Sequence, residues 1–124
     1  MPDNETTVRN FISAWSRLDP NELSEFFTED GVYHNIPTQP VKGRANVRAL
    51  IAGFVGGWSD TAWELVTLVA SGDIVVAERV DRMKVGGRAV ALPCCGVFEM
   101  RGGKIAVWRD YFDMKTFVDA AQGG

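Results

Sequence analysis

The stretch VVAERVDRMKV, residues 75–85, places two opposite charges on the apolar face of a predicted strand. Its residues alternate with a period of two, which is typical of a β-strand. One face becomes steadily more polar along the strand, whereas the other is apolar except for Arg79 and Asp81 at its centre. Charges taken out of water cost several kcal/mol each unless they are paired. Such a pair is either structural or part of a site, and strand spacing alone favours a structural pair.

Three further strands surround this stretch, and helices precede them. Alternation predicts strands over residues 61–70, 73–85, 88–101 and 104–112, with turns at Ser71-Gly72-Asp73, Gly86-Gly87 and Gly102-Gly103. Helical spacing predicts helices over residues 4–18, from Asp19-Pro20 to about Thr28, and from Gly43. A short extended segment spans residues 32–36, and Asp113 is placed to cap a last short helix. Helices followed by a meander predict an α+β cone, whose curved mixed or antiparallel sheet encloses one apolar pocket over the N-terminal helices.

Composition excludes several classes of function. The 124 residues are enough for one core and too few for two, so we expect a single domain over residues 1–124. The net charge is −3 and the basic residues are scattered, which argues against nucleic acid as a partner. No apolar run is long enough to cross a membrane, and no signal peptide opens the chain.

The cysteines and the histidine give no sign of a metal centre. Cys94 and Cys95 are neighbours, whose side chains point to opposite faces of a strand, so we expect two free thiols and a reducing, cytoplasmic location. His34 is the only histidine, and no phosphate-binding glycine motif is present. We therefore expect chemistry without a metal or a cofactor.

Three segments carry the polar residues of a candidate site. Tyr33 and Asn35 share one face of the extended segment, and without further information they are best explained as partners of nearby backbone. Arg79 and Asp81 form the second group. The third is Asp110, which alternates with aromatic residues on the last strand. Both faces of that strand are partly aromatic, so periodicity does not decide which face looks inward.

The chain resembles the limonene-1,2-epoxide hydrolases, within the ketosteroid-isomerase-like (nuclear-transport-factor-like) superfamily. The resemblance extends over the whole chain and is sharpest at residues 33–37, 78–81, 96–99 and 103–113. It implies that Asp110 is the general base, with Tyr33 and Asn35 holding the attacking water. It further implies that Asp81 is the general acid and that Arg79 orients both carboxylates. Water then attacks the epoxide directly, with no covalent ester and no cofactor.

Elementary chemistry supports this division of roles. Epoxide opening needs a nucleophile at carbon and a proton at oxygen almost at once, hence two groups in opposite protonation states. Two aspartates and one arginine, if all ionised, leave a negative charge in an apolar pocket. We therefore expect the two carboxylates to share one proton and to titrate as a coupled pair.

The expected pocket is apolar, and its partner is a small apolar epoxide, cyclic or bulky ones included. Strand parity and the resemblance place six residues in its lining: Met83, Leu92, Cys94, Phe98, Trp108 and Phe112. The resemblance implies larger branched aliphatic residues at the position of Cys94-Cys95. The smaller cysteines would enlarge or reshape the pocket, so limonene oxide itself is in doubt as the substrate. Arg82 and Arg109 are predicted on outward faces, and His34 is predicted to be a packing or surface residue.

The outer face of the sheet suggests self-association. It carries Val66, Val76, Val80 and Val107, which is more apolar than the exposed sheet of a monomer, so we expect a homodimer. Two other functions stay open from the sequence. A ketosteroid-type isomerase or polyketide cyclase would use one aspartate as a base beside a tyrosine. A non-catalytic cone would simply bind an apolar ligand.

Overall fold

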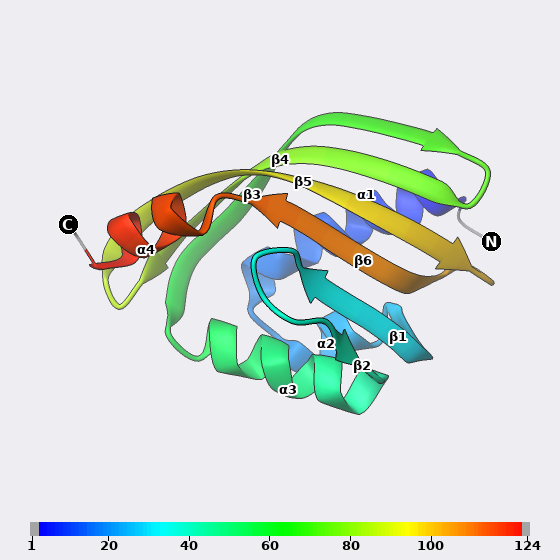
Figure 1. Cartoon of the computed structure of the whole chain (residues 1–124), viewed down its shortest axis with the longest axis horizontal. Coiled ribbons are helices and arrows are strands. Elements are labelled where there is room, and N and C mark those ends of the chain that lie inside the picture. Colours follow the sequence, from blue (N-terminus) through cyan, green and yellow to red (C-terminus); the bar gives the residue numbers. More distant parts are fainter. Residues whose placement is uncertain (1–2, 123–124) are drawn as a thin grey trace.

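The computed structural model describes residues 3–122 and has an α+β fold in which one sheet curves over the N-terminal helices (Figure 1). The sheet contains β1 (Phe27–Asn35), β2 (Val41–Lys42), β3 (Trp58–Ser71), β4 (Ile74–Val85), β5 (Arg88–Arg101) and β6 (Lys104–Phe112). The helices are α1 (Asn4–Ala14), the 3₁₀ turn η1 (Trp15–Arg17), α2 (Pro20–Ser24), α3 (Arg44–Val55) and α4 (Met114–Gln122). None of the helices in this part of the chain is long and apolar enough to cross a membrane.

The six strands form one mixed sheet in the order β2-β1-β6-β5-β4-β3. The meander β3-β4-β5-β6 is antiparallel, and β1 pairs with β6 in parallel. Two of its hairpin turns need glycine, because Gly86 and Gly87 have φ of 56° and 83°, and Gly102 and Gly103 have φ of 58° and 78°. The predicted meander is confirmed, and the parallel pairing brings the early extended segment beside the last strand.

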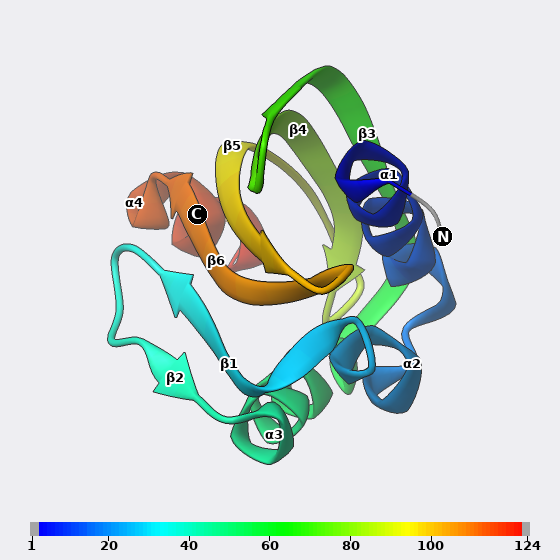
Figure 2. The same ribbon diagram turned by 90° about the vertical axis from the view of Figure 1, so that its right-hand side faces the viewer.

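Helices α1, α2 and α3 lie on the concave side of the curve (Figure 2), whereas α4 follows β6 at one end of the sheet (Figure 1). α1 packs against β3 and β4, α3 packs against β1, and α4 packs against β5. Aspartate side chains cap the N-termini of α1 and α2. Asp3 accepts a hydrogen bond from the Thr6 amide, and Asp19 accepts one from the Asn21 amide.

An aromatic core fills the space between the helices and the sheet. Phe11 of α1 is fully buried and makes edge-to-face contacts with Trp15, Phe27, Phe98 and Trp108. Such contacts add about 0.5–1.5 kcal/mol each to the area that they bury. They fix one wall of the interior, and the candidate site lies beside this wall.

Several local boundaries differ from the sequence prediction, among them the start of β1 at Phe27 and not at residue 32. The second helix ends at Ser24 and not near Thr28, because Phe27 already belongs to β1, where it pairs with Ile105. The first α-helix ends at Ala14 and continues only as η1, which stops at Leu18 in the left-handed conformation. The strand predicted from residue 61 begins at Trp58, since its first residues already pair with the end of β4. The two-residue strand β2 was not predicted.

Candidate active site

One buried guanidinium group bridges two buried carboxylates at the centre of the sheet. Arg79 donates from Nε and Nη2 to the two carboxylate oxygens of Asp81, at 2.9 Å each. It also donates from Nη1 and Nη2 to the two oxygens of Asp110, at 2.9 and 2.8 Å. Exposure of the three residues is 1%, 3% and 4% for Arg79, Asp81 and Asp110. The sequence prediction that Arg79 and Asp81 point inward is confirmed, and Asp110 joins them from β6.

The register of the sheet explains how residues far apart in sequence meet. Alternate residues of β4 face the interior, which puts Arg79 and Asp81 side by side. On β5, Cys94 lies opposite Arg79, and Gly96 lies opposite Asp110 of β6. On β1, Asn35 pairs with Asp110 and Tyr33 pairs with Trp108. Long-range pairing, and not the pattern of β6 alone, therefore settles which face of the last strand looks inward.

Aromatic rings and a glycine hold the guanidinium in place. Its central carbon lies 4.8 Å from the ring centroid of Trp63 and 5.6 Å from that of Trp108. A Cβ atom at Gly96 would lie 2.8 Å from Nη1 of Arg79 and 2.8 Å from Nε1 of Trp108. The absence of a side chain at Gly96 thus allows both groups to lie against β5. Sequence reasoning missed this role, although a glycine inside a strand is a signal for such a close approach.

The protonation states follow from burial and from the two opposite charges. Burial lowers the pKa of Arg79, but the charges of Asp110 and Asp81 outweigh it, so the pKa lies well above its usual range. Burial raises the pKa of Asp81, although the charge and hydrogen bonds of Arg79 act against this effect. The site therefore combines a permanent cation with a carboxyl group whose pKa is raised.

Tyr33 and Asn35 lie next to this group on β1, and both are buried. The Tyr33 ring stacks on Trp108, with ring centroids 4.2 Å apart and planes 8° apart. Burial, followed by the charge of Asp110, raises the pKa of Tyr33 well above its usual range. The hydroxyl group thus stays protonated and can donate a hydrogen bond next to Asp110. The two side chains share one face, as the sequence predicts.

A cavity of about 300 Å³ opens over the carboxylates. Its polar end contains Tyr33, Asn35, Asp81 and Asp110. Apolar side chains from four elements line much of the rest: Leu50 and Phe54 of α3, Trp58 and Trp63 of β3, Met83 of β4, and Met114 and Phe117 of α4. An apolar cavity with a few convergent polar groups is typical of a small-molecule site.

Half of the residues predicted in the pocket lining lie behind it. Met83, Leu92 and Phe112 line the cavity. Phe98 and Trp108 are fully buried in the aromatic core, because Trp108 is stacked between Tyr33 and Phe98 and its ring is covered on both faces. Cys94 lies close to the two carboxylates but is not part of the cavity lining. Leu50 of α3 and the lining from α4 were missed, since strand parity gives no information about helices that cover the sheet.

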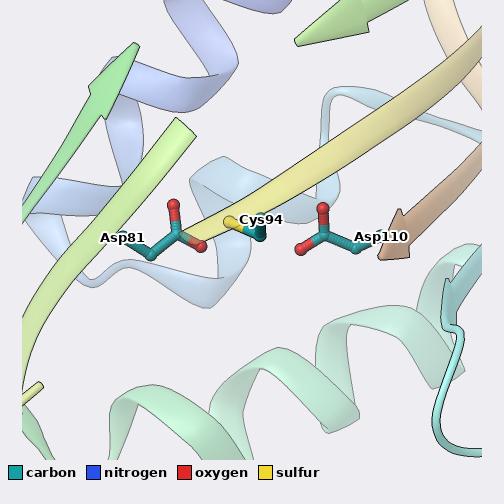
Figure 3. Close-up of side chains that lie close together, drawn as sticks. All are labelled: Asp81, Cys94 and Asp110. Carbon is teal, nitrogen blue, oxygen red and sulfur yellow. The ribbon is translucent and has the colours of Figure 1, made fainter. Parts of the chain in front are cut away.

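The charges of Asp81 and Asp110 are already balanced in part by Arg79, without a metal ion between them. Ligand atoms of Asp81, Cys94 and Asp110 lie within 4.8 Å of one another (Figure 3). The guanidinium of Arg79, however, already binds both carboxylates and supplies the positive charge between them.

The other charged residues near the site have structural partners. Asp113 accepts hydrogen bonds from the amide and hydroxyl groups of Thr116 at the start of α4, so it is a helix cap, as predicted. On the outer face, Arg82 pairs with Glu64 and Arg109 pairs with Glu99. The half-buried His34 ring lies 3.0 Å from the carbonyl oxygen of Thr38.

Comparisons with known proteins agree with this site. The family model of the limonene-1,2-epoxide hydrolase catalytic domain matches residues 2–122. Epoxide hydrolase EphG of Mycobacterium tuberculosis is 30% identical over 107 residues, which cover 86% of this chain and 71% of EphG.

Two solved structures have the same fold as this chain. The structure of an M. tuberculosis LEH-like epoxide hydrolase superposes with a TM-score of 0.83 at 27% identity, covering 98% of this chain and 90% of that one. A SnoaL-like polyketide cyclase of Shewanella putrefaciens has a TM-score of 0.86 at 15% identity, covering 100% and 99% of the two chains, which shows the shared cone fold alone. The chain therefore belongs to the limonene-1,2-epoxide hydrolase family, and it is an epoxide hydrolase.

Proposed function

We propose that this enzyme opens an apolar epoxide to a vicinal diol by direct attack of one activated water, without a metal or a cofactor. The observation that carries the proposal is the bridge that Arg79 makes between Asp81 and Asp110 at the polar end of an apolar cavity. One cation and two anions leave a net negative charge that burial disfavours, and one bound proton removes it. The pair then contains one acid and one base.

Asp81 is the proposed acid. Burial raises the pKa of Asp81, which favours its protonated form, and the residue lines the cavity. Its proton can pass to the epoxide oxygen as the carbon–oxygen bond breaks, so the leaving alkoxide becomes a hydroxyl group. Arg79 keeps two bonds to the resulting carboxylate and stabilises its charge.

Asp110 is the proposed base, and Tyr33 and Asn35 are the proposed water ligands. All three line the same end of the cavity, and Asn35 pairs with Asp110 across β1 and β6. A water bound there gives one proton to Asp110 while its oxygen attacks the epoxide carbon. Because the tyrosine hydroxyl and the asparagine amide fix the water, much of the orientational cost is met before the reaction starts.

The Asp110→Asn variant tests this assignment against a matched control. We expect it to fold and to lose about 10²–10⁴-fold or more in kcat/KM on a panel of cyclohexene, styrene, limonene and stilbene oxides, because the water loses its base. Asp113→Asn removes a carboxylate three residues away that only caps α4, so its kcat/KM should stay near the wild-type value. Near-normal turnover by Asp110→Asn would contradict the proposed role.

We also propose that the enzyme is a homodimer through the outer face of its sheet. Val66 and Val69 are 54% and 59% exposed on β3, and Tyr111 of β6 is 45% exposed. Val76, Val80 and Val107 are half-buried on the same face. Sedimentation equilibrium should give twice the monomer mass, and a monomer at micromolar concentration would contradict this proposal.

Both cysteines are free thiols, for which we expect a reducing compartment such as the cytoplasm.

A further inference from the structure

Cys94 is a buried group at the centre of the site that the proposed reaction does not use. It lies on β5 directly opposite Arg79 and is only 6% exposed. Its sulfur, one carboxylate oxygen of Asp81 and one of Asp110 all lie within 4.8 Å of one another. Figure 3 shows the two carboxylates turned towards each other from β4 and β6, with the Cys94 side chain between them. A side chain here can act on either carboxylate without contacting the substrate.

The thiol is a hydrogen-bond donor in this position. Burial, the largest effect, raises the pKa of Cys94, and the negative charges of Asp81 and Asp110 act in the same direction against the charge of Arg79. The sulfur therefore keeps its hydrogen at neutral pH. The thiol donates to the carbonyl oxygen of Arg79, which lies 3.9 Å from Sγ, and a carboxylate oxygen of Asp81 within 4.8 Å of the same sulfur is the alternative acceptor. A thiol is a weak donor, but in a dry site a weak donor still affects the group it meets.

The free lone pairs of the Asp81 carboxyl oxygens indicate how a donor at Cys94 affects the acidic proton. Each carboxylate oxygen of Asp81 already accepts one bond from Arg79, at 2.9 Å. A carboxylate oxygen has a second lone pair, so two positions stay available for the acidic proton. A donor approaching from β5 makes one of them unfavourable for that proton, which leaves the other position, towards the cavity.

We propose that Cys94 is a positioning residue, whose thiol bonds to Asp81 and directs the acidic proton of Asp81 towards the bound epoxide. The inference rests on the proposed role of Asp81 as the acid. The titratable groups that face Asp81 are Arg79 on its own strand, Cys94 on β5, Asp110 on β6 and Tyr33 on β1. The cavity residues of α3, α4 and β3 that cover it carry no charge.

The pH dependence of kcat/KM separates this role from packing. A donor to the ionised carboxylate lowers its pKa, so a hydrogen bond from the Cys94 thiol would lower the pKa of Asp81. The alkaline limb of the profile is the pH range in which kcat/KM falls because Asp81 loses its proton. We expect Cys94→Ala to move this limb to higher pH by about half a pH unit. Cys94→Ser, a stronger donor, should move it to lower pH by a similar amount. Cys95→Ser changes the neighbouring, half-buried thiol on the opposite face and should leave the profile unchanged.

Two outcomes overturn the inference. If the alkaline limb stays in place in both Cys94 variants, or moves in the same direction in both, the thiol only fills space or bonds to the Arg79 carbonyl. The Asp81→Asn variant distinguishes this failure from failure of the proposed mechanism. If Asp81→Asn is inactive while the limb is unmoved, only the role of Cys94 is wrong. If Asp81→Asn turns over epoxide at the wild-type rate, Asp81 is not the acid and both proposals fail.

Discussion

Arg79 and Arg82 lie three residues apart on β4 and both bind carboxylates, yet they belong to different kinds of ion pair. The Arg79 side chain is 0% exposed and makes four hydrogen bonds to two buried aspartates. The side chains of Arg82 and Glu64 are 53% and 55% exposed on the outer face. Water screens the outer pair, whereas the inner pair must satisfy its charges within the protein. Arginine–carboxylate pairs thus form the buried candidate site on one face of β4 and a solvated surface on the other.

The largest difference between the two arginines should appear in activity. Lysine keeps the charge at either position but cannot reproduce a planar fork that bonds two carboxylates at once. We expect Arg79→Lys to lower kcat/KM by about 10²-fold or more, because both carboxylates lose their fixed geometry. Arg82→Lys should leave kcat/KM near the wild-type value. Steady-state kinetics on one epoxide compares them, and equal effects would show that burial does not distinguish the two residues.

The aspartates of the two environments should respond to pH with opposite sign. The pKa of Asp81 is raised, mainly by burial, so its contribution to stability is fully present below about 3.9, its usual pKa. This contribution is lost as the pH rises through the raised value. In urea unfolding at several pH values, the free energy of unfolding of the wild type should fall as the pH rises. In Asp81→Asn this fall should be smaller.

The exposed cap Asp113 provides the control for that measurement. Hydrogen bonds from Thr116 lower the pKa of Asp113, so its contribution is present above about 3.9 and is lost as the pH falls through the lowered value. Asp113→Asn should therefore change the pH dependence only at the acid end. A wild-type pH dependence in Asp81→Asn would show that burial does not set the protonation of that residue.

The smallest effect is expected for the outer ion pair. Replacing Arg82 by methionine removes its contact with Glu64, which is largely exposed to solvent. We expect the free energy of unfolding to fall by about 0–1 kcal/mol, and less at high salt. Urea titration at two salt concentrations measures this change. A loss as large as that of a buried pair, about 3–5 kcal/mol, would remove the distinction between the two faces.

The sequence was sufficient for the local part of the site. A period of two along β4 places Arg79 and Asp81 on one inward face, and the structure confirms this. Periodicity could not decide which way Asp110 points, because aromatic residues occupy both faces of β6 and the parallel pairing with β1 is a long-range feature. The family resemblance alone put Asp110 in the candidate site. The space that Gly96 leaves for Arg79 was missed for a similar reason, since a glycine inside a strand indicates a close approach but does not identify the group across the sheet that makes it.

The cavity shows a similar division. Residues of β4 and β5 were found in its lining by strand parity, whereas the side chains of α3 and α4 depend on how helices cover the sheet. Phe98 and Trp108 have the right parity for the interior but belong to the core, because the interior holds both a packed aromatic wall and an open cavity. Periodicity distinguishes inside from outside, but it does not distinguish a core from a pocket.

Single-turnover hydrolysis in ¹⁸O-labelled water, with enzyme in excess over epoxide, tests the central claim most directly. If Asp110 activates a water that attacks the epoxide itself, the diol of the first turnover carries the label. The same experiment with Asp110→Asn should give no diol on that timescale. An unlabelled diol in the first turnover would contradict the account, because its oxygen would have come from a protein carboxylate through a covalent ester.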